Sequence, residues 1–503
     1  MNKKILILSV FVVASCGLAY ELIAGALSSY LLGDSILQFS TIIGCYLFAM
    51  GVGAHLSKYV KDEEVLARFV DIELAVGLIG GVSAALLFLT FSWMTAPFRT
   101  LLYVMVFLVG ALVGMEVPLV MRALNERNTE FNELVSRVLT FDYLGALAVS
   151  LLFPLVLAPY LGLVRTGFLF GMLNVGVAFW TIYVFRHELV NVTGRVLRAS
   201  CVMCTLVFGF ALADRMTHWG EHGLFGDEIV YSTTTPYQRL VITRWKDDLR
   251  LYINGNLQFS SRDEYRYHEA LVHPVLEALP WARRVLVLGG GDGLALREIL
   301  RYPNIEHVTV VDLDPAMTGA FTTREELVKL NGASFRDKRA HVVNADAAIW
   351  LKESDDMFDA VIIDFPDPSS FALGKLYSVP FYGMVKKHLS ANGLAVVQST
   401  SPFFAPHAYW TIDATLRDVG MRTYPYHAYV PSFGEWGFIL ASPQRDYTPP
   451  LSYRLPMRYL NADTTREMFI FPPDMRPMTM APNRLNTQSL VHEFEQDWRR
   501  VIR

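Results

Sequence analysis

The stretch Arg284-Val-Leu-Val-Leu-Gly-Gly-Gly-Asp-Gly293 decides the fold of the C-terminal half of the chain. A run of aliphatic residues ends in four glycines around one acid, and an amphipathic segment from Leu294 to Tyr302 follows at once. This order predicts a buried parallel strand, a tight turn and the start of a helix, the first unit of a nucleotide-binding α/β sheet. Glycine lets the backbone take positive φ and approach a ligand closely.

Three further strand-like runs follow, and each ends in acid. The acids are Asp312 and Asp314 in the run 308–314, Asp346 in the run 340–346, and Asp364 in the run 358–364. Ligands of open parallel sheets bind at the carboxyl ends of the strands, so we expect these acids to surround one cleft. Asp312 follows Gly289 by roughly 20 residues, the spacing at which an acid binds ribose hydroxyls. The alternative is that the acids cap the helices that follow them.

Three motifs together resemble the polyamine aminopropyltransferases, the spermidine synthase family. They are Gly289-Gly-Gly-Asp-Gly293, Tyr267-His-Glu269 before it and Asp364-Phe-Pro-Asp-Pro368 after it. The resemblance covers roughly residues 230–442. It implies transfer of an aminopropyl group from decarboxylated S-adenosylmethionine to putrescine, which gives spermidine and 5'-methylthioadenosine. The donor is then a co-substrate, and no separate cofactor is expected.

The resemblance also implies roles for single residues. Asp364 is the implied catalytic proton acceptor. The implied amine-binding residues are Tyr267, His268, Asp292 and Asp367, with Asp292 holding the aminopropyl ammonium of the donor. The implied nucleoside-binding residues are Gln238, Gly289, Gly290, Gly291, Asp312, Asp346 and Ala347, with Asp312 on the ribose and Asp346 with Ala347 on the adenine. The sequence has no metal-ligand spacing, so no metal site is expected.

The chemistry itself calls for carboxylates. A sulfonium makes the adjacent propyl carbon electrophilic, and the attacking amine must be uncharged. Because amines with a pKa near 10 are protonated at neutral pH, a base must accept the proton at the site. Donor and acceptor are both cationic, which favours a cleft lined by acids.

Two other functions stay open. A methyltransferase shares this sheet and a similar glycine-rich turn, but it must accommodate the carboxylate of intact S-adenosylmethionine, which Asp292 would repel. A membrane-coupled polyamine sensor or transport regulator needs no base, so Asp364 argues against it. The acceptor amine is open as well: Phe365-Pro366 and Ser369-Ser-Phe-Ala372 depart from the loop that is usual in the family.

The N-terminal half is much more apolar than a soluble domain. Hydrophobic residues make up 52% of the 503-residue chain. Apolar runs of spanning length cover about 5–27, 36–57, 69–91, 101–121, 138–160, 163–185 and 197–213. This pattern predicts an α-helical, multi-pass transmembrane bundle in the lipid bilayer of the cell (inner) membrane. Val13-Ala-Ser-Cys16 resembles a lipoprotein cleavage site, but the apolar sequence continues through Leu32, which favours an uncleaved helix.

Two arguments about the side of the membrane on which the C-terminal half lies disagree. Lys and Arg residues concentrate in the connections 58–68, 122–137 and 186–198, and the positive-inside rule places these connections in the cytoplasm. Seven crossings then place the C-terminal half outside, whereas the implied donor is an intracellular metabolite. We favour a cytoplasmic catalytic half, with the seventh run or the fifth run, which contains Pro154 and Pro159, failing to cross.

Four acids lie inside the apolar runs: Glu21, Glu73, Glu116 and Asp142. Such acids usually face the interior of a helix bundle or a cavity, which favours a cation pathway or a sensing site. The alternative is that they lie near helix ends and pair with Arg122 or Arg137. All four cysteines are also in this half, and Cys201-x-x-Cys204 is best explained by apolar packing.

The predicted organisation has five parts: a transmembrane domain over 1–213, a linker over 214–228, a small β-domain over 229–275, a Rossmann-like, methyltransferase-type domain over 276–445 and an extension over 446–503. The formal net charge of −4 and the lack of a basic stripe argue against a nucleic-acid partner. Soluble members of the family resembled here commonly form dimers or tetramers, so self-association is expected.

Overall fold

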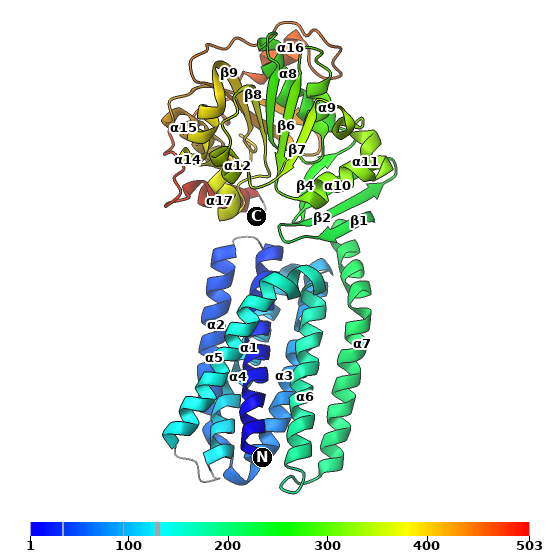
Figure 1. The fold of residues 1–503 in the computed structure, drawn as a ribbon, viewed down its shortest axis with the longest axis vertical. Helices are drawn as coiled ribbons and strands as arrows, with labels where there is room; N and C mark the ends of the chain where they lie inside the picture. Colours follow the sequence, from blue (N-terminus) through cyan, green and yellow to red (C-terminus); the bar gives the residue numbers. More distant parts are fainter. Residues whose placement is uncertain (1, 33–34, 94, 126–130, 502–503) are drawn as a thin grey trace. The chain divides into compact units, whose positions relative to one another are not determined.

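The computed structural model describes residues 2–32, 35–93, 95–125 and 131–501. The chain divides into two compact units, Met1–Glu228 and Ile229–Arg503 (Figure 1). The N-terminal unit is helical, and the C-terminal unit contains two β-sheets with helices around them.

The described part of the N-terminal unit has seven segments that are long and apolar enough to cross a membrane. Their helices are α1 (Asn2–Leu32), α2 (Ser35–Leu56), α3 (Val65–Trp93), α4 (Thr95–Asn125), α5 (Phe131–Leu152), α6 (Leu163–Val184) and α7 (Val192–Phe225). Two short turns, η1 (Ser57–Tyr59) and η2 (Asp62–Glu64), connect α2 to α3. The last helix continues far beyond the predicted run 197–213, so most of the predicted linker is helical.

Glycine-lined faces bring these helices close together. A Cβ atom on Gly77 of α3 would lie 2.9 Å from the carbonyl oxygen of Gly171 on α6, and one on Gly171 would lie 3.0 Å from the Cα of Gly81. Small residues of this kind let helix backbones approach each other, as is common in membrane bundles. Large apolar side chains on the outside of the unit, such as Phe48 and Phe208, are exposed. The outer surface of this unit is therefore suited to lipid.

The two prolines of the fifth segment do not interrupt it. The chain passes from α5 directly into a π-helical turn, η3 (Phe153–Leu161), which contains Pro154 and Pro159. Proline has no N–H to donate, and a wider turn accommodates the missing hydrogen bonds within a continuous helix. The turn ends at Gly162, whose φ of 76° suits glycine.

The C-terminal unit begins with a four-stranded antiparallel sheet. Its strands are β1 (Glu228–Thr234), β2 (Arg239–Trp245), β3 (Asp248–Ile253) and β4 (Asn256–Ser260), paired in that order. Asn254 and Gly255 connect β3 to β4 with φ angles of 50° and 82°, the positive values that a two-residue hairpin turn requires. The helix α8 (Glu264–Ala278) follows.

The second sheet has seven strands in the order β10-β11-β9-β8-β5-β6-β7. The five central strands are parallel: β5 (Arg284–Gly289), β6 (His307–Asp312), β7 (Ala340–Asn344), β8 (Phe358–Asp364) and β9 (Leu389–Gln398). An antiparallel hairpin of β10 (Arg422–Val430) and β11 (Gly434–Ser442) completes one edge. From β5 the sheet grows to one side with β6 and β7, and then to the other side with β8 and β9. The ligand crevice of such a fold is expected at the carboxyl ends of β5 and β8, where the two sides meet.

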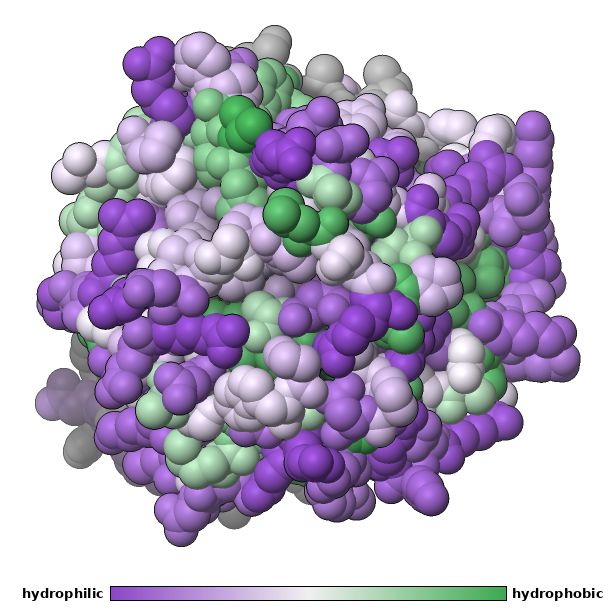
Figure 2. Space-filling model, turned by 90° about the horizontal axis from the view of Figure 1, so that it is seen from above, coloured by the Kyte–Doolittle hydropathy of each residue, from purple (hydrophilic) through white to green (hydrophobic). Residues whose placement is uncertain are grey.

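Helices cover this sheet, and their main bounds are α9 (Leu294–Leu300), α10 (Pro315–Thr323), α11 (Glu325–Leu330), α12 (Ala347–Glu353), α14 (Val379–His388) and α15 (Pro406–Asp418). Shorter turns are η4 (Ser334–Arg336), α13 (Phe371–Gly374) and η5 (Lys375–Tyr377), and the extension holds α16 (Ala462–Met468) and α17 (Ser489–Val501). Figure 2 shows a face of the molecule that is mainly hydrophilic, with small apolar patches.

The C-terminal extension packs against the sheet domain. The carboxylate of Glu269 on α8 accepts hydrogen bonds from the backbone amides of Arg458, Tyr459 and Leu460. Asn483 donates to the carbonyl oxygens of Gly374 and Tyr377. These contacts hold the Pro-rich segment in place although it forms little regular structure.

Candidate active site

The glycine turn after β5 has no room for a Cβ atom at Gly289 or Gly291. Gly289 and Gly290 have φ angles of 83° and 66°. A Cβ atom on Gly289 would overlap the backbone carbonyl of Asp364, and one on Gly291 would lie 2.5 Å from the carboxylate of Asp312. The amide of Gly291 instead donates a hydrogen bond to Asp312 at 3.1 Å. Glycine here lets the ends of β5, β6 and β8 approach each other.

Tyr267 and Asp364 form the centre of the site. The hydroxyl of Tyr267 donates to Oδ1 of Asp364 at 2.6 Å. The ring of Tyr267 packs against Phe438 of β11 and against His268. Burial raises the pKa of Asp364, while the His268 cation and the Tyr267 hydroxyl limit the rise. A carboxylate with a raised pKa is a better proton acceptor than an exposed one.

A buried ion network lies beside this pair. Nδ1 of His268 is 2.8 Å from Oε2 of Glu264, and Arg297 of α9 binds both oxygens of Glu264 at 2.9 Å. Burial alone would lower the pKa of His268, but the Glu264 carboxylate outweighs it and raises the pKa to about 9. His268 is therefore cationic at neutral pH.

Asp292 is a further buried acid of the site. It is 8% exposed, and its carboxylate accepts a hydrogen bond from the amide of Leu294 at 2.9 Å. Burial raises the pKa of Asp292 to about 6, although His268 opposes the rise. Asp292 and Asp364 interact electrostatically, so the structure brings these two predicted residues together.

Asp367 is held by the end of β9. Gln398 donates to Oδ1 of Asp367 at 3.1 Å, and the hydroxyl of Thr400 lies 3.3 Å from Oδ2. Thr400 has a φ of 58°, a rare conformation for a β-branched residue. Burial raises the pKa of Asp367 to about 6, and the hydrogen bonds from Gln398 and Thr400 oppose the rise. Strain of this kind is typical of functional sites.

The predicted nucleoside residues lie at the neighbouring strand ends. The carboxylate of Asp312 accepts hydrogen bonds from the backbone amides of Gly291 and Asp314, and burial raises its pKa to about 6. Gln238 lies in the turn between β1 and β2 of the small sheet and donates to Asp314 at 2.9 Å. Asp314 also caps α10, so the capping alternative describes this acid.

Asp346 has two partners of its own. Its Oδ1 caps α12 through the amides of Ala348 and Ile349, and its Oδ2 pairs with Lys375 at 2.7 Å. Burial favours a higher pKa for Asp346, but Lys375 and the amide hydrogen bonds hold it below its usual value. Ala347 begins the capped helix and is buried. The assignment of these two residues to the adenine stays a prediction.

Sequence reasoning missed the residues that hold the predicted ones. Arg297, Gln398, Thr400 and Lys375 contact acids of the site from segments far away along the chain. No local motif surrounds them. Their hydrogen-bond partners become visible only when the strands are placed side by side.

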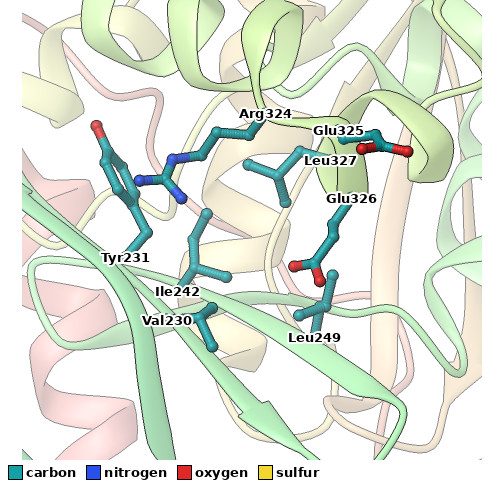
Figure 3. Close-up of a pocket in the computed structure, with 8 residues that line it drawn as sticks. All are labelled: Val230, Tyr231, Ile242, Leu249, Arg324, Glu325, Glu326 and Leu327. Atoms are coloured by element: carbon teal, nitrogen blue, oxygen red, sulfur yellow. The ribbon is translucent and has the colours of Figure 1, made fainter.

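A separate cavity of about 210 Å³ lies between the small sheet and α11 (Figure 3). Its lining includes Tyr231 and Leu249 from the sheet and Arg324 to Leu327 from the helical side. The guanidinium of Arg324 lies 4.1 Å from the ring centre of Tyr231. None of the predicted site residues lines this cavity, so it is distinct from the acidic site.

Comparison with known proteins identifies the family. Residues 264–450 match the family described as the spermine/spermidine synthase domain. Polyamine aminopropyltransferase 2 of Ralstonia nicotianae is 66% identical over the whole of both chains. The polyamine aminopropyltransferase of Leptospira interrogans is 49% identical over 99% of both chains. The chain belongs to the polyamine aminopropyltransferase family.

The family is shared along the full chain, including the helical N-terminal unit. An aminopropyltransferase is a transferase of polyamine biosynthesis, and its donor is a co-substrate rather than a bound cofactor. A crystal structure of spermidine synthase with the transition-state analogue AdoDATO is 25% identical and covers 49% of this chain and 86% of its own, with a TM-score of 0.46.

Proposed function

We propose that the chain transfers the aminopropyl group of decarboxylated S-adenosylmethionine to putrescine, and that the Tyr267–Asp364 pair performs the proton transfer. The observation that carries the proposal is the group of buried acids at the switch point between β5 and β8, where Tyr267 donates to Asp364. The names of the relatives, which share the whole chain, support the reaction class.

The reaction is a direct displacement. The lone pair of the amine attacks the propyl carbon bonded to sulfur, the C–N bond forms and the C–S bond breaks. The electron pair of the C–S bond stays on sulfur, which leaves neutral methylthioadenosine. Before the attack, the ammonium form of this nitrogen gives up one proton to Asp364, whose pKa burial raises, and this frees the lone pair.

The other acids bind cations and the nucleoside. Asp292 and Asp367 attract the ammonium groups of donor and acceptor, because both are buried acids that are ionised above pH 6. Asp312 receives the ribose hydroxyls beside the glycine turn of Gly289, Gly290 and Gly291, and Gln238, Asp346 and Ala347 contact the rest of the nucleoside. Asp346 must exchange its contact with Lys375 for the nucleoside or share it.

The N-terminal unit anchors the enzyme in the cell membrane. Its seven long apolar helices and their exposed apolar side chains support this proposal. The fifth and seventh segments span 30 and 29 residues, so neither is too short to cross. We keep the cytoplasmic placement of the catalytic unit because its donor is intracellular. With seven crossings this placement puts the N-terminus and the basic connections 58–68, 122–137 and 186–198 outside, against the positive-inside rule. Residues 126–130 of the basic connection 122–137 lie outside the described residues.

We propose the same five functional parts: a membrane domain over 1–213, a connection over 214–228 that begins as the end of α7, a small β-domain over 229–275, a catalytic domain over 276–445 and an extension over 446–503. Self-association of the catalytic units is part of it and is measured by the mass of the purified protein in detergent.

Product analysis tests the reaction. The purified full-length protein is given putrescine, cadaverine or spermidine with either decarboxylated or intact S-adenosylmethionine. We expect methylthioadenosine and spermidine from the decarboxylated donor with putrescine. Methylated amine from the intact donor would favour the methyltransferase instead. Binding of amine without turnover of either donor would favour the sensor.

A further inference from the structure

The core of the N-terminal unit contains a polar cluster formed by four helices. Its members are Tyr20 on α1, Glu73 on α3, Glu116 on α4 and Asn174 on α6, all at most 3% exposed. Asn174 donates to Oε2 of Glu73 at 3.1 Å. Glu116 and Tyr20 each interact electrostatically with Glu73, and they interact with each other. We call Glu73 and Glu116 the buried carboxylate pair.

Nearby arginines do not neutralise the pair. Arg122 binds Asp62 and the carbonyl oxygens of Ser57 and Val60. Arg137 pairs with Glu133 on its own helix. In the described residues, these arginines therefore do not pair with the acids of the apolar runs, as the alternative interpretation expected. The carboxylates lie deeper in the bundle than the helix-end cations.

Several oxygens of the cluster have no hydrogen-bond partner among the described residues. They are Oη of Tyr20, Oε1 of Glu73, both carboxylate oxygens of Glu116 and Oδ1 of Asn174. Oδ1 of Asn174 can only accept a hydrogen bond, and the carboxyl oxygens of Glu73 and Glu116 can only accept when these acids are ionised. Buried polar groups are almost always satisfied, and an unpaired charge among apolar helices is costly. A cation that donates hydrogen bonds would supply partners for these oxygens when Glu73 and Glu116 are ionised.

The chemistry of the oxygens selects the class of cation. The described residues contain no group of three or more His, Cys, Asp and Glu side chains that could hold a metal ion. A protonated amine has a compact charge and three N–H donors, as a lysine ammonium does, and it matches several acceptors spread over separate helices. Asp142 of α5 is partly buried and interacts electrostatically with Glu116, which extends the acidic character toward the outside of the bundle.

We propose that the buried carboxylate pair, together with Tyr20 and Asn174, binds an organic ammonium ion within the helical unit, at a site separate from Asp364. The proposal rests on the proposed function in the choice of putrescine as the probe and in the putrescine that the catalytic unit is expected to bind. The membrane unit then senses or passes the same class of amine that the catalytic unit uses.

Binding stoichiometry is the first test. Full-length protein in lipid nanodiscs is equilibrated with radiolabelled putrescine, and turnover is measured on the same sample. We expect two putrescines per chain in the wild type and one in the Glu73→Gln/Glu116→Gln variant, with turnover changed less than about twofold. Glutamine keeps the shape and removes the charge. The matched control is Glu133→Gln, an exposed acid of the same unit, which should still bind two.

The same data separate this proposal from the proposed function. Equal stoichiometry in the wild type and the double variant, with normal turnover, would overturn the ammonium site alone. Absence of turnover with two bound putrescines would overturn the proposed reaction and leave the ammonium site standing.

A second measurement uses the wild type and so does not depend on how a variant folds. A hydrophobic carbodiimide labels carboxyl groups inside membranes, and mass spectrometry follows the label on Glu116. We expect putrescine at ten times its dissociation constant to slow the labelling about tenfold. Labelling that sodium or a rise in pH slows, and that putrescine leaves unchanged, would show a metal-ion or proton site and overturn the proposal.

Discussion

The hydrogen bond between Tyr267 and Asp364 is the contact on which the proposed chemistry depends most. A hydrogen bond to a charged group contributes about 1.5–3 kcal/mol. Tyr267→Phe removes the hydroxyl and keeps the ring against Phe438. We expect kcat to fall about ten- to hundredfold, with the thermal midpoint nearly unchanged. An unaltered kcat would show that the hydroxyl does not position Asp364 for proton transfer.

Glu264 controls the charge state of the site through His268. Glu264→Gln removes the carboxylate that raises the pKa of His268 to about 9, so the imidazole loses its charge near neutral pH. The His268 cation normally lowers the pKa of both Asp292 and Asp364, and its loss raises them. We therefore expect the acidic limb of the kcat/KM profile to move to higher pH.

In the wild type, the acidic limb of the kcat/KM profile is expected near pH 6, where Asp292 and Asp367 become protonated and lose their attraction for cations. The control for Glu264→Gln is Glu277→Gln, a buried acid of the same helix that pairs with Arg454 of the extension. It should leave the profile in place. An unshifted limb in Glu264→Gln would contradict the charge coupling.

The acids of the site could be predicted from the sequence, but the residues that hydrogen-bond to them could not. Asp292 and Asp364 stand in local motifs, because a glycine turn and a strand end are visible in the sequence. Gln398 and Thr400 reach Asp367 from another strand, and nothing near them in the chain indicates the contact. The expected ring of acids is also less uniform than predicted, since Asp314 and Asp346 cap helices.

The glycine turn is the element that positions the acids. Gly291→Ala places a Cβ atom 2.5 Å from the Asp312 carboxylate and disturbs the amide hydrogen bond between them. We expect the KM for the aminopropyl donor to rise about tenfold or more, because about 1.4 kcal/mol of binding corresponds to a factor of ten. Steady-state kinetics with the donor varied provide the measurement.

Gly319→Ala is the matched control for this element. Gly319 lies in α10, and a Cβ atom there would meet nothing within 4 Å. Alanine in a helix is favoured over glycine by about 0.5–1 kcal/mol, so this variant should be slightly more stable and equally active. A donor KM that rises equally in both variants would show that the close approach at Gly291 is not what matters.

The elements themselves followed the sequence pattern closely. Buried aliphatic runs became β5, β6 and β8, and the apolar runs of the N-terminal half became long helices. The π-helical turn at Pro154 and Pro159 was not predicted, because the sequence indicates a break wherever proline removes an N–H. The ordering of the extension was missed too, since its contacts with Glu269 join distant segments.

The whole molecule combines an apolar helical unit with a catalytic unit whose site contains buried acids, and the side of the membrane on which the catalytic unit lies is testable. Fusing a fluorescent protein or alkaline phosphatase to the C-terminus reports the side, because the first fluoresces only in the cytoplasm and the second is active only outside. We expect fluorescence without phosphatase activity. The reverse result would support seven crossings with the basic connections inside.

The most direct test of the account is the rate of aminopropyl transfer by Asp364→Asn beside Asp413→Asn. Asp413 is a buried acid of α15 that pairs with Arg417 and takes no part in the proposed site. Loss of a general base costs about 10²–10⁴-fold, so we predict a fall of this size in kcat for Asp364→Asn and less than about twofold for Asp413→Asn. Spermidine formation at the wild-type rate in Asp364→Asn would contradict the central claim.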